Sequence, residues 1–378
     1  RVPAPMPAAP RPADARSARR RRLAAWIIGR RPPAPEADAP APTPEEAAAM
    51  EPGRGRDARA PADIPRRGWL DILLRTWRSF QADRLPAVSA GIAFYGLLSL
   101  FPTMAAFVSL YGLFADVATA QAQLAHLTGV VPADVLTFIG EQMTRIAAER
   151  TDSLSLTFLL SLLLSLWSAN AASKALFDGL NVAYHETEKR NFLILNLQTL
   201  AFTLGAVVFL ILAAAAIVVV PLLFEFLRLG EGAALLSLLR WPLLVLFMAA
   251  GLAVLYRFGP SRRPAGWRWI SWGAALAAAL WLGASLAFSW YVSDVANYTA
   301  TYGSLGAVVG LMMWLWVSAL VVLLGAELNS EIEHQTARDT TVGADRPMGR
   351  RGALVADSLG EARGEGAVQA GVAVTAAP

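Results

Sequence analysis

The sequence predicts an all-α polytopic membrane protein, a bundle of six transmembrane helices with amphipathic helices at the membrane interface. Of its 378 residues, 55% are hydrophobic and 16% are charged, and the mean hydropathy is +0.44. Soluble domains carry about a quarter of charged residues, so this composition favours a membrane protein. Long uncharged runs point the same way, since no Asp, Glu, Lys or Arg lies between Asp294 and Glu327. About 20 apolar residues are enough to span a bilayer core.

Six segments are long and apolar enough to be predicted as spans. They are residues 87–114, 154–172, 192–220, 235–256, 270–292 and 303–327. The fourth is the least regular, because only its residues 241–256 are free of charge. Before the first span, aromatic and aliphatic residues recur at helical spacing between residues 69 and 80, with arginines between them. This pattern predicts an amphipathic helix on the bilayer surface.

The two ends of the chain have a different composition. Residues 1–65 are rich in Pro, Ala and Arg, and residues 335–378 are of low complexity, so both are predicted to be disordered tails. With six spans, sixteen Lys and Arg residues fall on the loops and flanks of one side, against four on the other. The positive-inside rule then predicts that both termini are cytoplasmic. The sequence begins at Arg1 rather than Met, so its true start is left open.

The sixth span carries a face of small residues. Gly303, Gly306 and Gly310 follow at offsets of three and four, so they share one side of a helix. Small residues let helix backbones approach closely in lipid, where no hydrophobic effect drives helices together. The sequence therefore predicts a helix-packing face here, with the span 270–292 as its partner.

Six polar residues near the predicted cytoplasmic ends of the helices form a candidate vestibule. Four of them are spaced by four, four and three residues, which places them on one helix face. Polar groups in membrane segments usually face the bundle interior. The alternative is a solvated face in which a Lys–Asp pair contributes little. The six residues are Asn170, Lys174, Asp178, Asn181, Arg190 and Glu327.

The chain lacks the residues that several kinds of chemistry require. Cysteine is absent, which excludes disulfides, thiolate metal ligands and a cysteine nucleophile. No phosphate-binding glycine loop, His-Glu-x-x-His or Gly-x-Ser-x-Gly motif occurs. Glu331 and His334 have the spacing of a di-iron helix motif, but that site needs a second such motif and further carboxylates. We therefore expect a protein that is not an enzyme, with no catalytic residues, metal, cofactor or nucleic-acid partner, and with membrane lipids as its partners.

Three stretches of the chain resemble the signature regions of the YihY/BrkB family, which was once labelled ribonuclease BN. They are residues 87–104, 168–192 and 301–334. The resemblance implies a six-helix protein of the bacterial inner membrane. Links within that family to envelope lipid handling imply transport or lipid translocation. Both tails are longer than is usual for the family.

Two functions from different classes follow. The first is a transporter or lipid-translocating envelope protein of unknown substrate, and the alternative is a membrane scaffold that transports nothing. Ribonuclease activity is not expected, because hydrolysis of RNA needs acid–base groups or metals in a water-filled basic site. A pocket lined by the six vestibule residues would favour transport, whereas a solid bundle would favour the scaffold. A homo-oligomer is left open.

Overall fold

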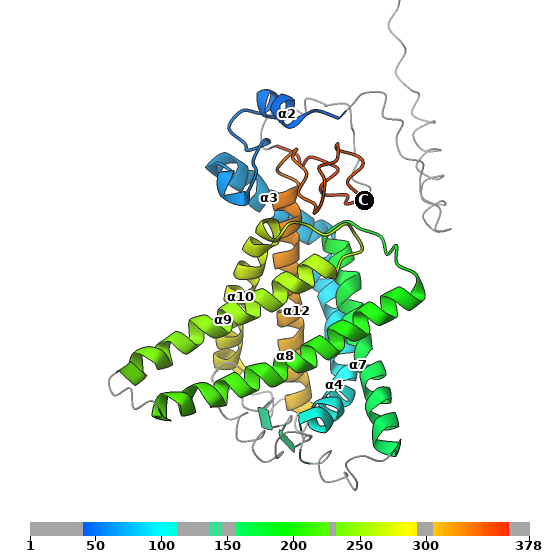
Figure 1. Cartoon of the computed structure of the whole chain (residues 1–378), viewed down its shortest axis with the longest axis vertical. Helices are drawn as coiled ribbons and strands as arrows, with labels where there is room; N and C mark the ends of the chain where they lie inside the picture. Colours follow the sequence, from blue (N-terminus) through cyan, green and yellow to red (C-terminus); the bar gives the residue numbers. More distant parts are fainter. Residues whose placement is uncertain are drawn as a thin grey trace, which may run out of the picture. The chain divides into compact units, whose positions relative to one another are not determined.

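The computed structural model describes residues 41–111, 136, 137, 140, 141, 144, 156–226, 232–292 and 305–362. Within these ranges the chain is all-α, as predicted, with one isolated β-bridge between Ala265 and Thr341. The helices, drawn in Figure 1, are α2 (Pro44–Met50), the 3₁₀ turn η1 (Pro61–Asp63), α3 (Arg66–Ala82), α4 (Leu85–Tyr111), α7 (Leu156–Ala183), α8 (Phe192–Phe226), α9 (Gly232–Phe258), α10 (Trp267–Trp290) and α12 (Gly306–Glu333).

Each of the six predicted spans falls largely on one long helix. Helices α7 and α12 run further than predicted, to Ala183 and Glu333, so their polar last turns are continuous with their apolar parts. Among the described residues, three helical stretches are long and apolar enough to cross a membrane: Phe192–Ala213, Trp267–Trp290 and Gly306–Glu333. Two shorter apolar helical stretches lie at Leu85–Leu100 and Pro242–Phe258. The crossing of the membrane by all six helices stays a prediction.

Helices α10 and α12 pack antiparallel to each other through small and polar residues. The Gly273 amide donates to Asn329 Oδ1 at 2.8 Å, near the start of α10 and the end of α12. Further along the pair, the indole of Trp281 donates to Ser318 at 3.0 Å. Such bonds satisfy polar groups that lipid cannot hydrogen-bond. Helix α10 is therefore the partner of α12 that the sequence predicted.

The closest approach between α12 and described neighbours is at Gly325, outside the predicted glycine face. A Cβ at Gly325 would lie 2.5 Å from Tyr256 Oη and 2.7 Å from Ala277 Cβ. A Cβ at Gly310 would meet no atom within 4 Å among the described residues, although Gly310 is buried. Gly306 is also buried, and Gly303 lies outside the described residues. A run of small residues does not say which of them a neighbouring helix meets, and the packing role of Gly303, Gly306 and Gly310 stays a prediction.

The segments next to the predicted tails are packed, which corrects the expectation of disorder over 42–65 and 335–362. Arg56 is 2% exposed, and its guanidinium donates to the carbonyls of Gln335 and Gly360 at 3.3 and 2.6 Å. Arg351 donates in the same way to the carbonyl of Ala337 at 2.7 Å. A hydropathy pattern contains no information about such hydrogen bonds from arginine to backbone carbonyls. The sequence therefore predicted disorder in segments that these bonds hold in place. Figure 1 shows α2, α3 and the segment after α12 at the same end of α12, which we call the polar end.

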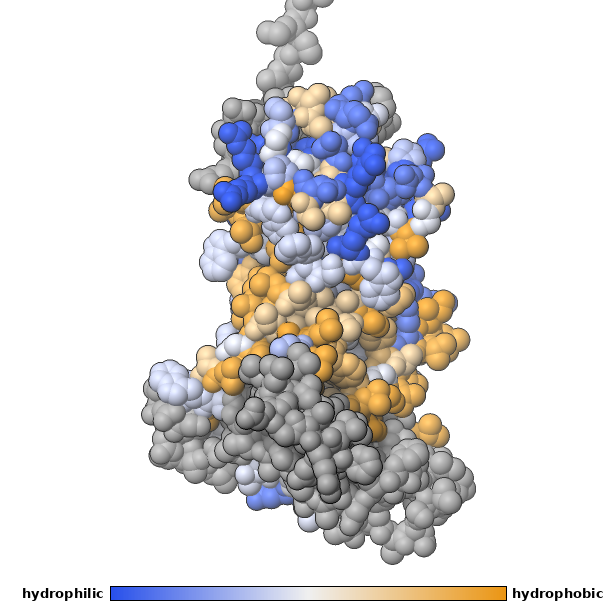
Figure 2. All heavy atoms as spheres, turned by 60° about the vertical axis from the view of Figure 1, so that its left-hand side comes forward, coloured by the Kyte–Doolittle hydropathy of each residue, from blue (hydrophilic) through white to orange (hydrophobic). Residues whose placement is uncertain are grey.

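Hydrophilic residues gather over the polar end, and hydrophobic residues cover the part next to it (Figure 2). Helix α3 has an exposed apolar side. Leu70, Leu73 and Trp77 are 51%, 53% and 62% exposed. The opposite side buries Arg75, whose Nε lies 2.6 Å from Glu331 Oε2 on α12. An inward charged face and an outward apolar face suit a helix at the membrane interface, as the sequence predicted.

Candidate functional site

A cavity of about 520 Å³ lies where the start of α8 meets the end of α9. We call it the basic cavity, because five of its lining residues are cationic and none is acidic. The lining consists of Lys189, Arg190, Asn191, Ile194, Gln198, Arg257, Phe258, Pro260, Ser261, Arg262, Arg263, Pro264 and Gly352.

The loop between α7 and α8 supplies one wall of the basic cavity. Helix α7 ends in a Schellman motif: the amide of His185 donates to the carbonyl of Val182 at 2.9 Å, and that of Glu186 to the carbonyl of Asn181 at 2.8 Å. His185 takes the left-handed conformation that this motif needs, with φ of 53°. Asn191 then caps α8 by accepting a hydrogen bond from the Ile194 amide at 2.8 Å. These two helix ends fix the short loop that carries the cationic residues of this wall.

Arg190 is held by a carboxylate beside the cavity. Its guanidinium makes a two-pronged contact with Glu188, at 2.7 Å from Nε to Oε1 and 2.6 Å from Nη2 to Oε2. It also donates to Gln198 Oε1 at 2.8 Å and to the Gly259 carbonyl at 2.9 Å. Burial alone would raise the pKa of Glu188, but hydrogen bonds from Arg190 and Asn181 outweigh it and lower the pKa to about 2. Glu188 is therefore ionised at neutral pH, and it orients Arg190.

Arg257 differs from the other cations of the lining. Lys189 pairs with Glu186 at 2.5 Å, Arg262 with Glu333 at 2.6 Å, and Arg263 with Asp339 at 3.8 Å. Among the described residues Arg257 makes no ion pair. Its Nη1 donates to the Ala265 carbonyl at 2.8 Å, and its guanidinium lies 4.4 Å from the Trp267 ring centroid. No described group forms a hydrogen bond with its buried Nε. Arg257 therefore carries a positive charge that the described protein groups leave uncompensated.

The surroundings of the cavity suit an anionic group that is attached to an apolar one. The N-terminus of α8, at Asn191, points partial positive charge toward anions. Immediately after it, Phe192, Leu193 and Leu197 are 74%, 74% and 68% exposed. The lining reaches Gln198, about 9 Å along α8 from its first residue at 1.5 Å per residue. Charge and exposed apolar surface thus adjoin at this point.

Two residues of the predicted vestibule meet beside the basic cavity. Asn181 Nδ2 donates to Glu188 Oε2 at 3.0 Å, and its Oδ1 accepts from the Ser261 amide at 2.7 Å. Asn181 and Arg190 thus share Glu188 as a partner. Of the six predicted residues, Arg190 belongs to the cavity lining.

The other four predicted residues lie elsewhere among the described side chains. Asn170 is buried, with its Oδ1 3.5 Å from Thr203 Oγ1. Lys174 lies over the Trp167 ring at 5.5 Å, and Asp178 is exposed. The six residues therefore do not form one lining, and the face that four of them share on α7 is partly buried and partly exposed along its length.

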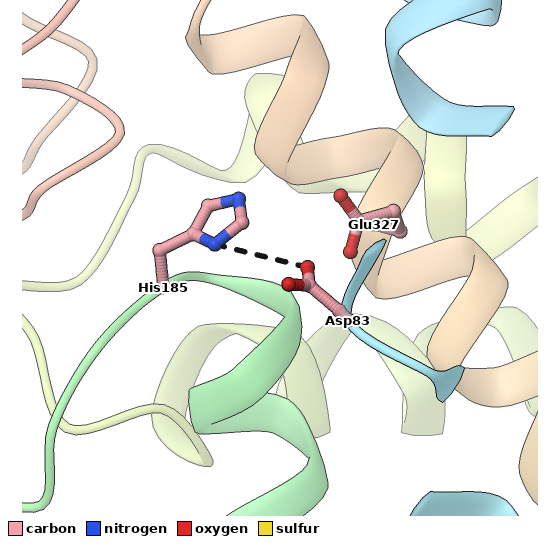
Figure 3. A group of neighbouring side chains, drawn as sticks. All are labelled: Asp83, His185 and Glu327. Carbon is pink, nitrogen blue, oxygen red and sulfur yellow. Dashed lines mark ion pairs between the residues drawn. The ribbon is translucent and has the colours of Figure 1, made fainter. Parts of the chain in front are cut away.

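Glu327 belongs to a different group of side chains. It is 0% exposed, and potential ligand atoms of Glu327, Asp83 and His185 all lie within 4.8 Å of one another. Figure 3 shows the three side chains as neighbours. Burial raises the pKa of Asp83, and the charge of His185 opposes that rise. The sequence did not predict Asp83 in this group or Arg257 at the cavity. The cluster of cations between residues 257 and 263 was the available signal for the cavity, whereas nothing local marked Asp83.

Most of the chain is similar to a known family of proteins. The model of a family described as virulence factor BrkB matches residues 76–348. A protein of Bacillus subtilis (strain 168), YfkH, whose name describes it as ribonuclease-like, is 32% identical over 250 residues, covering 64% of this chain and 88% of that protein. A UPF0761 membrane protein of Tolumonas auensis is 28% identical over 263 residues, covering 68% of this chain and 83% of that protein. No solved structure matches the chain.

Proposed function

Because this chain belongs to the virulence factor BrkB family of membrane proteins, we propose that it binds an anionic amphiphile at the cytoplasmic face and moves it across the bacterial inner membrane. The amphiphile that fits best is a lipid with a phosphate-bearing headgroup. The observation that carries this proposal is the basic cavity, which adjoins the exposed apolar residues at the start of α8.

The chemistry of the cavity supports a phosphate ligand. A guanidinium group matches phosphate oxygens with two parallel hydrogen bonds, and it stays charged at all physiological pH. Arg257 offers such a group without a carboxylate partner among the described residues. The volume of about 520 Å³ falls in the range of about 300–1,000 Å³ of small-molecule sites. A headgroup would occupy the cavity while its acyl chains lie along the exposed apolar side of α8.

The orientation follows from the same residues. Three segments contact one another at the polar end: the loops at 184–191 and 259–266 and the segment 334–360. These segments hold eight of the sixteen cationic residues that the positive-inside rule assigns to the cytoplasm. The basic cavity would therefore open toward the inner leaflet of the membrane, where anionic headgroups are available to it.

The scaffold alternative also has an observation in its favour. Asn181 and Arg190 are engaged in hydrogen bonds within the protein, as a purely structural role requires. A nuclease at this cavity has less support, because its lining contains no Asp, Glu or His to act as acid or base. The name of the Bacillus subtilis relative therefore finds no counterpart in the residues that line the cavity.

The test is lipid movement in reconstituted vesicles. The full-length protein is placed in phosphatidylcholine vesicles that contain fluorescent NBD-phosphatidylglycerol or, separately, NBD-phosphatidylcholine. Dithionite added outside quenches the outer leaflet, so further loss of fluorescence reports translocation. We expect the wild type to accelerate translocation of the anionic lipid selectively, and Arg257→Gln to slow it about tenfold, which corresponds to about 1.4 kcal/mol of lost interaction.

The matched control is Arg268→Gln, which removes the same charge from an exposed residue outside the lining. It should translocate the anionic lipid like the wild type. Equal rates with and without wild-type protein would refute transport and favour the scaffold. Equal losses in both variants would refute the assignment of the cavity as the site.

A further inference from the structure

We propose that Asp83, His185 and Glu327 form a binding site for one divalent transition-metal ion, of which zinc is the best match. The three residues come from three separate elements: the corner between α3 and α4, the end of α7, and α12 (Figure 3). One ligand atom of each lies within 4.8 Å of the other two. This inference is independent of lipid binding at the basic cavity.

Glu327 supplies the observation that points to a ligand. Its side chain is 0% exposed and is directed toward Asp83 and His185, and neither carboxylate oxygen has a hydrogen-bond partner among the described residues. Asp83 Oδ2 is likewise buried, and no described group forms a hydrogen bond with it. An ionised carboxylate in such a place is strongly unfavourable unless a positive charge compensates it. Two ionised carboxylates side by side, those of Glu327 and Asp83, would be even less favourable without a positive charge.

A neighbouring acid shows how this chain treats a buried carboxylate that has protein partners. Glu331 lies one turn further along α12. It is paired with Arg75 at 2.6 Å, and it accepts from the Ser79 hydroxyl at 3.1 Å. Glu327 has no such arginine among the described residues. The charged groups that act on it most strongly are two acids, Glu331 and Asp83. A cation held between Glu327, Asp83 and His185 would supply the compensating charge that the described protein groups do not give to Glu327.

The donor set selects the type of cation. One imidazole nitrogen and two carboxylates suit zinc better than calcium or magnesium, which prefer oxygen ligands alone. Zinc binds these donors at about 2.0–2.2 Å, so tetrahedral ligand atoms lie about 3.4 Å apart. His185 Nδ1 and Asp83 Oδ2 are already 3.7 Å apart. The ligand atom of Glu327 lies within 4.8 Å of the other two, so an approach of at most about 1.4 Å brings it to tetrahedral spacing. The fourth position is left for water.

Such an ion would tie α3, α7 and α12 together at the polar end. The three ligands would then be fixed relative to one another, whereas without the ion two carboxylates face each other. We therefore expect metal binding to stabilise the fold as well as to be measurable by itself.

The experiment uses the full-length protein in detergent, with its purification tag removed, stripped with EDTA and dialysed. Zinc is titrated against it by isothermal calorimetry, and melting temperatures are measured with and without zinc. We expect about one site per chain in the wild type. Glu327→Gln keeps the shape of the side chain and should weaken zinc binding at least about tenfold, the lower limit seen even for outer-shell ligand partners.

Two further variants exclude misfolding as an explanation. His185→Gly removes the imidazole at a position whose φ of 53° favours glycine, so it should fold well and bind zinc weakly. Asp178→Asn removes the same charge as Glu327→Gln from an exposed position on α7, and it should bind zinc like the wild type.

Zinc should raise the melting temperature of the wild type and of Asp178→Asn, but not that of Glu327→Gln or His185→Gly. A wild type that binds no zinc at concentrations comparable with the protein would overturn the proposal. So would zinc binding that persists unchanged in Glu327→Gln, because the ion would then lie elsewhere.

Discussion

The contact at Gly325 allows a quantitative prediction about the pairing of α10 with α12. In Gly325→Ala the new Cβ would lie 2.7 Å from both Ala277 Cβ and the Gly273 carbonyl oxygen, and 2.5 Å from Tyr256 Oη. Real Cβ atoms do not approach others so closely, so α10 must move away or Tyr256 must turn. Turning Tyr256 breaks its 2.7 Å hydrogen bond to the Val322 carbonyl.

The expected change in stability of Gly325→Ala combines three contributions. Overpacking of a tight contact costs about 1–3 kcal/mol, and loss of one hydrogen bond costs about 0.5–1.5 kcal/mol. Replacing Gly by Ala within a helix returns about 1 kcal/mol. Gly325→Ala should therefore destabilise the protein by about 1–3 kcal/mol. Gly310→Ala meets no described atom within 4 Å, so it should stabilise by up to about 1 kcal/mol.

Thermal melts of the two variants in the same detergent test this difference. The two variants should differ by about 1–4 kcal/mol. At about 2–4 °C per kcal/mol for a domain of this size, Gly310→Ala should melt about 2–16 °C above Gly325→Ala. Equal melting temperatures for Gly325→Ala and the wild type would refute the reasoning. So would a loss at Gly310 as large as the loss at Gly325, because the packing face would then be the one that the sequence suggested.

Two further predictions concern pH and topology. The folded pKa of Glu188, about 2, lies below its ordinary value of 4.5, so its stabilising effect is complete above pH 4.5 and is lost as pH falls toward 2. In denaturant titrations, the difference in stability between the wild type and Glu188→Gln should shrink over that window. A constant difference would contradict the pairing with Arg190. Because the chain has no cysteine, a single introduced cysteine can be labelled selectively. A cysteine at exposed Ala344 should react with an impermeant maleimide only in permeabilised cells, whereas one at Ala296, outside the described residues, should react in intact cells. The reverse pattern would show that the predicted topology is inverted.

The polar end illustrates why hydropathy misjudged part of the chain. Residues 335–362 contain few large apolar residues, and their sequence resembles a tail. They are nevertheless packed, because guanidinium groups such as those of Arg56 and Arg351 bond to backbone carbonyls of distant segments. Which carbonyl an arginine reaches depends on the fold, so composition alone could not predict the order of this segment.

The sequence by itself determined the all-α membrane class, the approximate positions of the long helices and the grouping of basic loops. These properties follow from apolar runs and charge, which are local and can be counted along the chain. Only the tertiary structure decided that α10 meets α12 at Gly325, that Arg190 and Arg257 line one cavity, and that Glu327 faces Asp83. Each of these depends on which faces of separate helices meet, and that is fixed by packing between segments far apart in the chain.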